Sequence, residues 1–144
     1  MAKWIVDSSE MTTLEQLDDT TQRRIRREMV ENAAKVLVKE MQASIEGHHH
    51  VVRRYMKDSV APGPVHEDID GTSIEVWPQG EDPRGVSNEM KLKIIEYGYY
   101  DSFSGRRHKK IDYFLNDSFR KKCEPRILAV MNATLAHCID ELNN

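Results

Sequence analysis

Two long segments of the chain repeat apolar residues at the three- and four-residue spacing of an α-helix. The first segment carries the apolar stripe Leu14, Leu17, Ile25, Met29, Ala33, Val36, Leu37, Met41 and Ile45. Most charged residues of this segment lie off the stripe, which predicts an amphipathic helix that buries one face. Thr12 and Glu15 have the spacing of a capping box, and Gly47 is a natural stop. A break between Leu17 and Thr21 would give a short helix followed by a long one.

The last third of the chain repeats the same spacing. Its stripe consists of Phe114, Leu115, Phe119, Cys123, Ile127, Met131, Leu135, Ile139 and Leu142. Asp112 or Asn116 could cap this second helix. We expect Pro125 to kink the helix or to restart it as a first-turn proline. Cys123 and Cys138 lie in the same predicted helix, and at roughly 1.5 Å of rise per residue they are too far apart to form a disulfide.

Between the helices the pattern changes to the alternation of β-strands. In the segment from Thr72 to Trp77, Ile74 and Val76 face one side while the intervening residues face the other. Pro78 is expected to end that strand. An earlier strand is predicted to begin near Val60, and a short strand or anchoring arm at Trp4, Ile5 and Val6.

Prolines and glycines predict how these strands are joined. Pro62, Gly63 and Pro64 interrupt the strand that begins near Val60, which predicts a bulged strand or a strand at the sheet edge. Asp70-Gly71 has the composition of a two-residue hairpin turn, because both central positions of that turn type need positive φ.

The segment after Pro78 is harder to assign. Gln79 to Gly85 is expected to be a polar loop and Tyr99 to Gly105 a flexible turn. The apolar run from Met90 to Tyr97 fits a strand or a short helix, since periodicity cannot decide so short a run. Arg106 to Lys110 is a basic run. The whole segment from Asp70 to Gly98 contains no catalytic constellation and is interpreted as a structural core segment.

These elements predict one domain over residues 1–144 with an α+β fold, in which two long helices pack on a small antiparallel sheet that contains a β-hairpin. The 144 residues are 39% hydrophobic and 31% charged, with a net charge of −3. That balance suits a small globular domain, or a subunit that covers part of its surface in an assembly. Two isolated cysteines and a start without the apolar run of a signal sequence predict synthesis in a reducing compartment. We expect no membrane span, because no segment approaches the necessary apolar length.

Candidate chemistry is sparse. Three consecutive histidines, His48 to His50, project in different directions and cannot close a tetrahedral metal site unaided, so a solvated helix end or loop is favoured. Ser59, His66 and Asp70 are near in sequence, but nothing orients them as a triad. The methionines are interpreted as core filler rather than a binding groove: Met29, Met41, Met56, Met90 and Met131. The sequence therefore predicts no enzyme and no cofactor.

The order of motifs resembles the tail-completion proteins of siphophages, the minor tail-component family of lambda-like phages. Five motifs of this chain carry the resemblance: the strand entry Met56 to Val60, the Asp70-Gly71 hairpin, the segment Ile74 to Gly80, the segment Gly85-Val86-Ser87-Asn88, and the apolar stretch Ile94 to Gly98. The similarity follows the chain in order from about Thr20 onward.

The resemblance implies a non-catalytic virion component of the neck, where capsid and tail meet. It implies a ring of identical subunits in contact with the tail tube or terminator and with the head connector, assembled in the host cytoplasm from a phage or prophage. A ring around the DNA path would allow non-specific DNA contact. The residues expected at the assembly contacts lie in the hairpin tip, the polar loop and the basic run: Asp70, Gly71, Gln79, Glu81, Asp82, Arg84, Arg106, Arg107, Lys109 and Lys110.

A second hypothesis is a small nucleic-acid-binding regulator. It would use the arginines of Arg23 to Arg27 and the basic run Arg106 to Lys110, whose side chains could contact phosphates. Against phosphate contact, Asp101, Asp112 and Asp117 dilute the positive charge around the run, and a solvated loop or a charged subunit interface is favoured.

Overall fold

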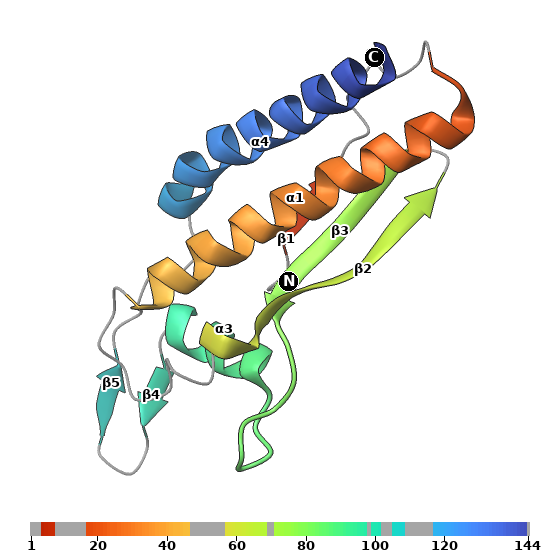
Figure 1. The fold of residues 1–144 in the computed structure, drawn as a ribbon. Helices are drawn as coiled ribbons and strands as arrows, with labels where there is room; N and C mark the ends of the chain where they lie inside the picture. The colour runs from red at the N-terminus through yellow and green to blue at the C-terminus, as the bar shows by residue number, and fades with distance from the viewer. Residues whose placement is uncertain are drawn as a thin grey trace.

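The fold has three layers, with one long helix in the middle (Figure 1). Helix α1 (Asp19–Glu46) packs on one side against a three-stranded antiparallel sheet and on the other against helix α4 (Asp117–Asn143). The sheet has the order β1 (Trp4–Asp7), β3 (Gly71–Pro78) and β2 (Val60–Asp68). The predicted α+β fold is confirmed. The computed structural model describes residues 4–7, 17–46, 57–68, 71–97, 99–101, 105–108 and 117–143.

Helix α1 begins and ends with local signals. The Oδ1 atom of Asp18 accepts a hydrogen bond of 2.7 Å from the backbone N–H of Thr21, which is the arrangement of an N-cap. This bond lowers the pKa of Asp18 below its usual range. The start at Asp19 falls within the break predicted between Leu17 and Thr21, and the helix ends at Glu46, directly before the predicted stop. Thr12 and Glu15 lie outside the described residues.

The core is organised along α1. Eight of its side chains are buried, at 0 to 1% exposure: Ile25, Met29, Val30, Ala33, Ala34, Leu37, Met41 and Ile45. Val30 and Ala34 are not part of the stripe predicted from the sequence. They are buried because α1 is covered from two sides, by α4 and by the sheet, whereas a single apolar stripe predicts only one covered face.

Polar groups fix how α4 lies on α1. The Asn32 side-chain amide donates to the hydroxyl oxygen of Thr134 over 3.1 Å, and that hydroxyl donates to the carbonyl of Val130 over 2.8 Å. Arg126 of α4 forms an ion pair with Glu40 of α1. Since hydrogen bonds require particular partners, this pattern selects one register of the two helices among those that would bury similar apolar area.

Both cysteines are buried, and they are free thiols, as their separation along the helix predicted. The thiol of Cys138 donates to a carboxylate oxygen of Glu28 over 3.2 Å. Burial, together with this neighbouring carboxylate, raises the pKa of Cys138 to about 11. Burial also raises the pKa of Cys123. At neutral pH both groups are therefore protonated and act as small apolar side chains.

Helix α4 continues through Pro125 from Asp117 to Asn143, so of the two predicted alternatives, a kink or a restart at this proline, the restart is wrong. Proline in a helix interior cannot donate to the carbonyl four residues earlier, here that of Lys121. Both Lys121 and Pro125 are exposed. Water can therefore bond the released carbonyl, and the proline is tolerated inside one helix.

The hairpin of β2 and β3 has the predicted irregularity. The register shifts between Pro62 and Val65, and β2 is an edge strand, which confirms the prediction made from the prolines. Gly71 pairs with Asp68, so the connecting residues are 69 and 70, one position earlier than predicted. Asp70 itself lies outside the described residues.

Strand β3 alternates as expected, with Ile74 and Val76 buried and Ser73, Glu75 and Trp77 half-exposed. Its last residue is Pro78, also as predicted, and the predicted strand at Trp4 is confirmed as β1. None of the described helices is both long enough and apolar enough to cross a membrane.

The segment after β3 contains elements that the sequence left open or assigned otherwise. Residues Asn88–Tyr97 form helix α3, which settles the ambiguity between strand and helix. Tyr99–Asp101 (β4) and Arg106–His108 (β5) pair as a two-stranded antiparallel sheet. The prediction of a flexible turn from Tyr99 onward is therefore wrong for the first three residues. Short strands of this kind depend on pairing between segments, which local composition does not report.

Because α1 lies between the sheet and α4, truncation of a buried side chain of α1 should lower the free energy of unfolding more than truncation of an exposed side chain. Leu37→Ala should lower the free energy of unfolding by about 2–5 kcal/mol, because Leu37 is fully buried and its truncation leaves a cavity. Leu128→Ala is the matched control: Leu128 is 52% exposed on α4, and its loss should cost less than about 1 kcal/mol. Urea unfolding curves of both variants measure the difference, and equal costs would contradict the burial of α1 from two sides.

The bulge of β2 predicts an effect of Gly63→Ala. A Cβ atom at this position would lie 2.6 Å from Cζ3 and 2.7 Å from Cη2 of Trp77. Since the ring must move, we expect a loss of about 1–3 kcal/mol in unfolding free energy and a shift in the emission of Trp77. The measurement is made in a Trp4→Phe background, where Trp77 is the only tryptophan. Unchanged emission and stability would show that the ring does not pack on Gly63.

Candidate assembly surface

The segments predicted to form assembly contacts lie at two ends of the molecule. In Figure 1 the end of β2 and the start of β3 lie beside the N-terminal end of α1. The loop after β3 and the β4–β5 sheet lie at the opposite end. Gly71 belongs to the first end, and the loop residues Gln79, Glu81, Asp82 and Arg84 belong to the second. Asp70, Lys109 and Lys110 lie outside the described residues.

Within the loop, Gln79 forms hydrogen bonds with two segments that are distant from it in the sequence. Its side-chain amide donates to the carbonyls of Ala61 and Pro62 over 3.0 and 3.2 Å. Its carbonyl accepts a hydrogen bond of 2.9 Å from the side chain of Asn88, the first residue of α3. Gln79 thus ties the bulged start of β2 to the start of α3, and its own polar groups are largely used inside the protein.

Asp82 has a similar internal role. Its Oδ1 atom accepts hydrogen bonds from the backbone N–H groups of Arg84 and Val86, at 2.9 and 3.0 Å, which closes the loop as an Asx turn. Its Oδ2 atom lies 2.7 Å from Nζ of Lys91, and the two side chains are only 11% and 9% exposed. Lys91 lies on the inner face of α3, so this ion pair fixes the loop to the helix.

These contacts favour the ionised form of Asp82. The hydrogen bond from Lys91, followed by that from the Val86 N–H, holds the pKa of Asp82 below its usual range. The carboxylate is therefore ionised throughout the pH range in which the protein is expected to act. Glu81 and Arg84 are exposed, and they are the loop residues whose charged groups are available to another molecule.

Helix α3 carries a feature that the sequence did not reveal. Its outer face, with the loop residue before it, exposes four apolar side chains, here named the α3 stripe: Val86, Met90, Ile94 and Tyr97. Met90 and Tyr97 are 56% and 67% exposed, so the interpretation of Met90 as core filler is wrong, although Met29, Met41 and Met131 are buried as expected. The inner face of α3 buries Leu92 instead.

The spacing explains why these side chains share a face. Met90, Ile94 and Tyr97 lie at i, i+4 and i+7 of one helix, which places them in a row. Assigning this run as a helix would have located the stripe, but periodicity alone left strand and helix open. A strand over the same run would have placed Met90 and Ile94 on one side and Tyr97 on the other.

The basic run is only partly described. Arg106 and Arg107 belong to β5, where they pair with Asp101 and Tyr100. The described part of the run is thus a strand.

The other candidate sites gain no support from the geometry. Ser59 lies just before β2, whereas His66 lies near its far end, a separation of roughly 20 Å at the rise of a strand. No group of three or more metal-ligating side chains occurs among the described residues. His48 to His50 lie outside them.

Comparison of the chain with protein-family models, with curated proteins and with solved structures found no match.

The buried pair predicts how the loop responds to pH. Asp82→Asn keeps the oxygen that closes the Asx turn but removes the charge opposite Lys91, so it should lower the free energy of unfolding at neutral pH. Because the folded-state pKa of Asp82 lies below the ordinary aspartate value of 3.8, the contribution of the carboxylate is present above pH 3.8 and lost as the pH falls below it.

The measurement is urea unfolding from neutral pH to below pH 3.8. The difference between wild type and Asp82→Asn should shrink over the acid end of this range. Asp140→Asn is the control, because Asp140 is exposed near the end of α4. A difference between wild type and Asp82→Asn that stays constant with pH would contradict the role given to the ion pair.

Proposed function

We propose that the protein is a structural virion subunit of the phage neck, a head–tail joining or tail-completion protein without catalytic activity. The observation that carries the proposal is the α3 stripe, an exposed row of apolar side chains next to the loop Gln79 to Arg84. Such a row has the spacing by which a helix face docks on another protein.

Single exposed apolar side chains are common on a protein surface, but a contiguous row bordered by polar groups is typical of an interaction site. Four of the six large apolar side chains that are exposed among the described residues belong to the α3 stripe. Covering them with a neighbouring subunit would remove this apolar surface from water.

Charged groups border the stripe as a polar rim would. Lys93 and Glu89 form an ion pair of 3.8 Å along α3, and Glu81 and Arg84 are exposed on the adjoining loop. An apolar centre with a charged rim is the usual anatomy of a protein interface. The rim also supplies the groups that would set the orientation of a neighbour.

The motif order supports the same surface. Ile74 to Gly80 covers most of β3 and its exit, Gly85 to Asn88 closes the loop, and Ile94 to Gly98 includes the end of α3. Three of the five motifs that resemble the tail-completion family therefore lead into the α3 stripe or belong to it.

In this proposal the stripe of one subunit contacts a different surface on the next copy, as a ring requires. The tail tube or terminator and the head connector are the further partners. The protein assembles in the host cytoplasm and remains in the virion, and the basic run contacts the DNA in the channel or a neighbouring protein.

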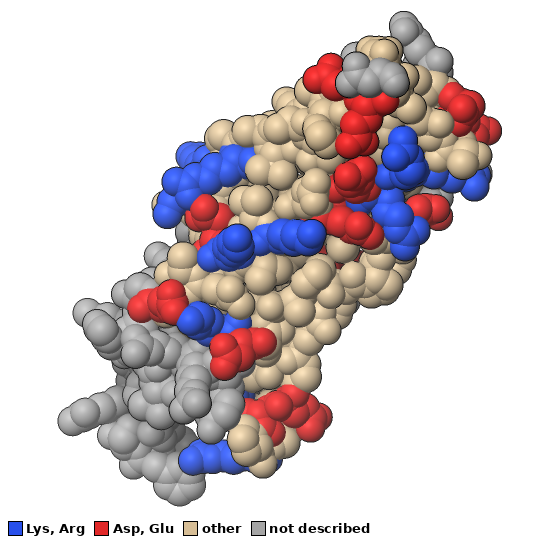
Figure 2. Space-filling model, in the orientation of Figure 1, with Lys and Arg blue, Asp and Glu red and all other residues tan. Residues whose placement is uncertain are grey.

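The alternative, a nucleic-acid-binding regulator, has less support. Arg27, which belongs to its proposed contact, is already paired with Glu31 at 3.4 Å and with Glu67 at 3.1 Å. On the face shown in Figure 2, Lys and Arg side chains lie interleaved with Asp and Glu side chains. A surface of this kind does not concentrate the positive charge that phosphate binding uses.

The α3 stripe predicts the effect of Ile94→Glu. The substitution places a charge in the middle of the stripe, so burial against a neighbour would cost the desolvation of a carboxylate. We expect particles that carry this variant to show unjoined heads and tails, or tails of abnormal form, by electron microscopy. The isolated protein should unfold at nearly the same urea concentration as the wild type, because Ile94 is 41% exposed.

Leu128→Glu is the matched control, since it introduces the same charge at an exposed leucine of α4, outside the stripe. It should leave particle assembly intact. Normal infectious particles formed without the protein would refute the neck assignment, whereas defective particles with both variants alike would refute only the role of the α3 stripe.

A further inference from the structure

The outer face of α4 is exposed and uncharged over much of its length. Residues 127–139 of this helix contain no Asp, Glu, Lys or Arg, although 31% of the chain is charged. Among the described elements, α4 packs mainly against α1, and the side that faces α1 buries Met131 and Cys138. On the face shown in Figure 2, tan surface covers the middle of α4, between Lys and Arg at its start and Asp and Glu near its end. This face belongs to a different element from the α3 stripe, so its role does not depend on the function proposed above.

Six exposed residues form a line along this outer face, here named the α4 seam: Lys122, Arg126, Ala129, Ala133, Ala136 and Asp140. Their spacing alternates steps of four and three residues, as do the contact positions of a helix that packs lengthwise on another helix. Arg126 also forms an ion pair with Glu40 of α1. Leu128 lies about 100° around the helix from Ala129 and is outside the seam.

The two ends of the seam carry opposite charges. Lys122 lies in the second turn of α4 and Asp140 in its last turn. Neither side chain forms a hydrogen bond or an ion pair with another described residue. The dipole of a helix favours the reverse order, with acidic groups near the start and basic groups near the end. The stability of α4 within one chain therefore does not account for this arrangement.

The seam is complementary to itself when a second copy is turned end to end. Positions 122 and 140, 126 and 136, and 129 and 133 are each equally far from residue 131. In an antiparallel pair centred there, Lys122 faces Asp140 of the other copy and Ala129 faces Ala133. A two-fold axis makes each of these contacts occur twice. The three alanines allow the two helix axes to approach closely along the middle of the pair.

We propose that the α4 seam binds a second copy of this chain, with the two α4 helices antiparallel across a two-fold axis. A parallel pair would place Lys122 against Lys122 and Asp140 against Asp140, and both contacts would repel. The antiparallel pair instead brings opposite charges together at both ends. Two helices alone form a small interface, so the dimer forms at high protein concentration and dilute protein is a monomer.

The test is sedimentation equilibrium of the full chain over a series of protein concentrations at low ionic strength and neutral pH. The average mass of the wild type should rise with concentration from that of one chain toward that of two. Lys122→Glu and Asp140→Lys should each weaken this association at least about tenfold, because each dimer then contains two like-charge contacts in place of two opposite-charge contacts. Both residues are exposed, so both variants should fold.

An equal mixture of the two variants tests the antiparallel geometry directly. In a mixed dimer of Lys122→Glu with Asp140→Lys, one end keeps the wild-type pair and the other end has the same pair with its charges exchanged. Both contacts are then attractive, so association should return close to that of the wild type. Lys35→Glu is the matched control, because Lys35 is exposed on α1 outside the seam and its variant should associate as the wild type does.

Three outcomes would overturn the proposal. The first is a wild type whose mass stays that of one chain at every concentration. The second is a mixture of the two variants that associates no better than either variant alone. The third is association that is lost in Ile94→Glu but kept in Lys122→Glu, which would assign the contact to the α3 stripe. Association lost in Lys122→Glu but kept in Ile94→Glu is the result expected for the α4 seam, whether or not the neck assignment holds.

Discussion

The burial of α1 on two sides is the constraint on which the rest of the structure depends. The sheet has only three strands and β1 has four residues, so the sheet offers a small apolar face. Helix α4 covers the opposite side of α1 and completes the core. Because eight side chains of α1 are buried between these two layers, the helix acts as the support against which the hairpin and α4 are both placed.

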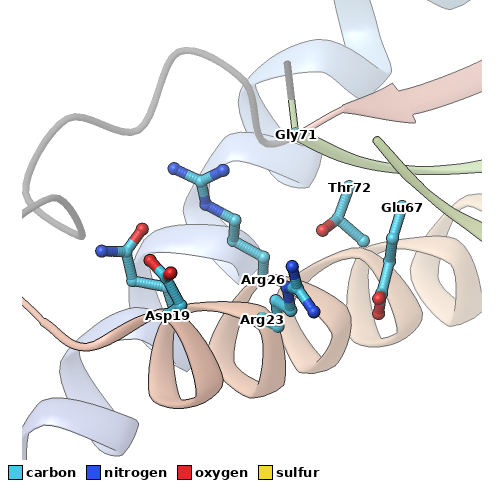
Figure 3. A pocket seen from close by; sticks show the side chains of 7 residues that line it. Asp19, Arg23, Arg26, Glu67, Gly71 and Thr72 are labelled. Carbon is cyan, nitrogen blue, oxygen red and sulfur yellow. The ribbon is translucent and has the colours of Figure 1, made fainter. Parts of the chain in front are cut away.

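This support leaves two surfaces at opposite ends with different chemistry. At one end, Gln79 and the Asp82–Lys91 pair hold the loop and α3 so that an apolar row faces water. At the other end, the first turns of α1 and the adjoining ends of β2 and β3 line a polar cleft (Figure 3). An apolar row favours association through released water, whereas the cleft is lined by both acidic and basic side chains.

The residues inferred for assembly separate into two roles in the structure. Gln79 and Asp82 use most of their polar groups within the chain, and Glu81 and Arg84 present theirs to solvent. Composition cannot make this separation, because a glutamine or aspartate in a polar loop is equally compatible with either role. The hydrogen bonds from Gln79 to Ala61 and Pro62 join segments about 18 residues apart, and contacts over such a distance follow from the hairpin rather than from the local sequence.

The sequence by itself determined the elements whose signals are local and long. The apolar period predicts both long helices, the alternation around Ile74 and Val76 predicts β3, and the prolines at 62 and 64 predict an irregular edge strand. Tertiary structure alone decided the burial and the secondary structure of residues that depend on contacts with a distant segment. Val30 and Ala34 are buried because both the sheet and α4 pack against α1. Tyr99–Asp101 is a strand because Arg106–His108 pairs with it. The short run Met90 to Tyr97 is a helix whose outer face remains exposed. A local pattern indicates which side chains are apolar, but only the packed chain decides which of them are buried. The packed chain also decides which polar atoms, such as Arg26 Nε, are buried without a hydrogen-bond partner.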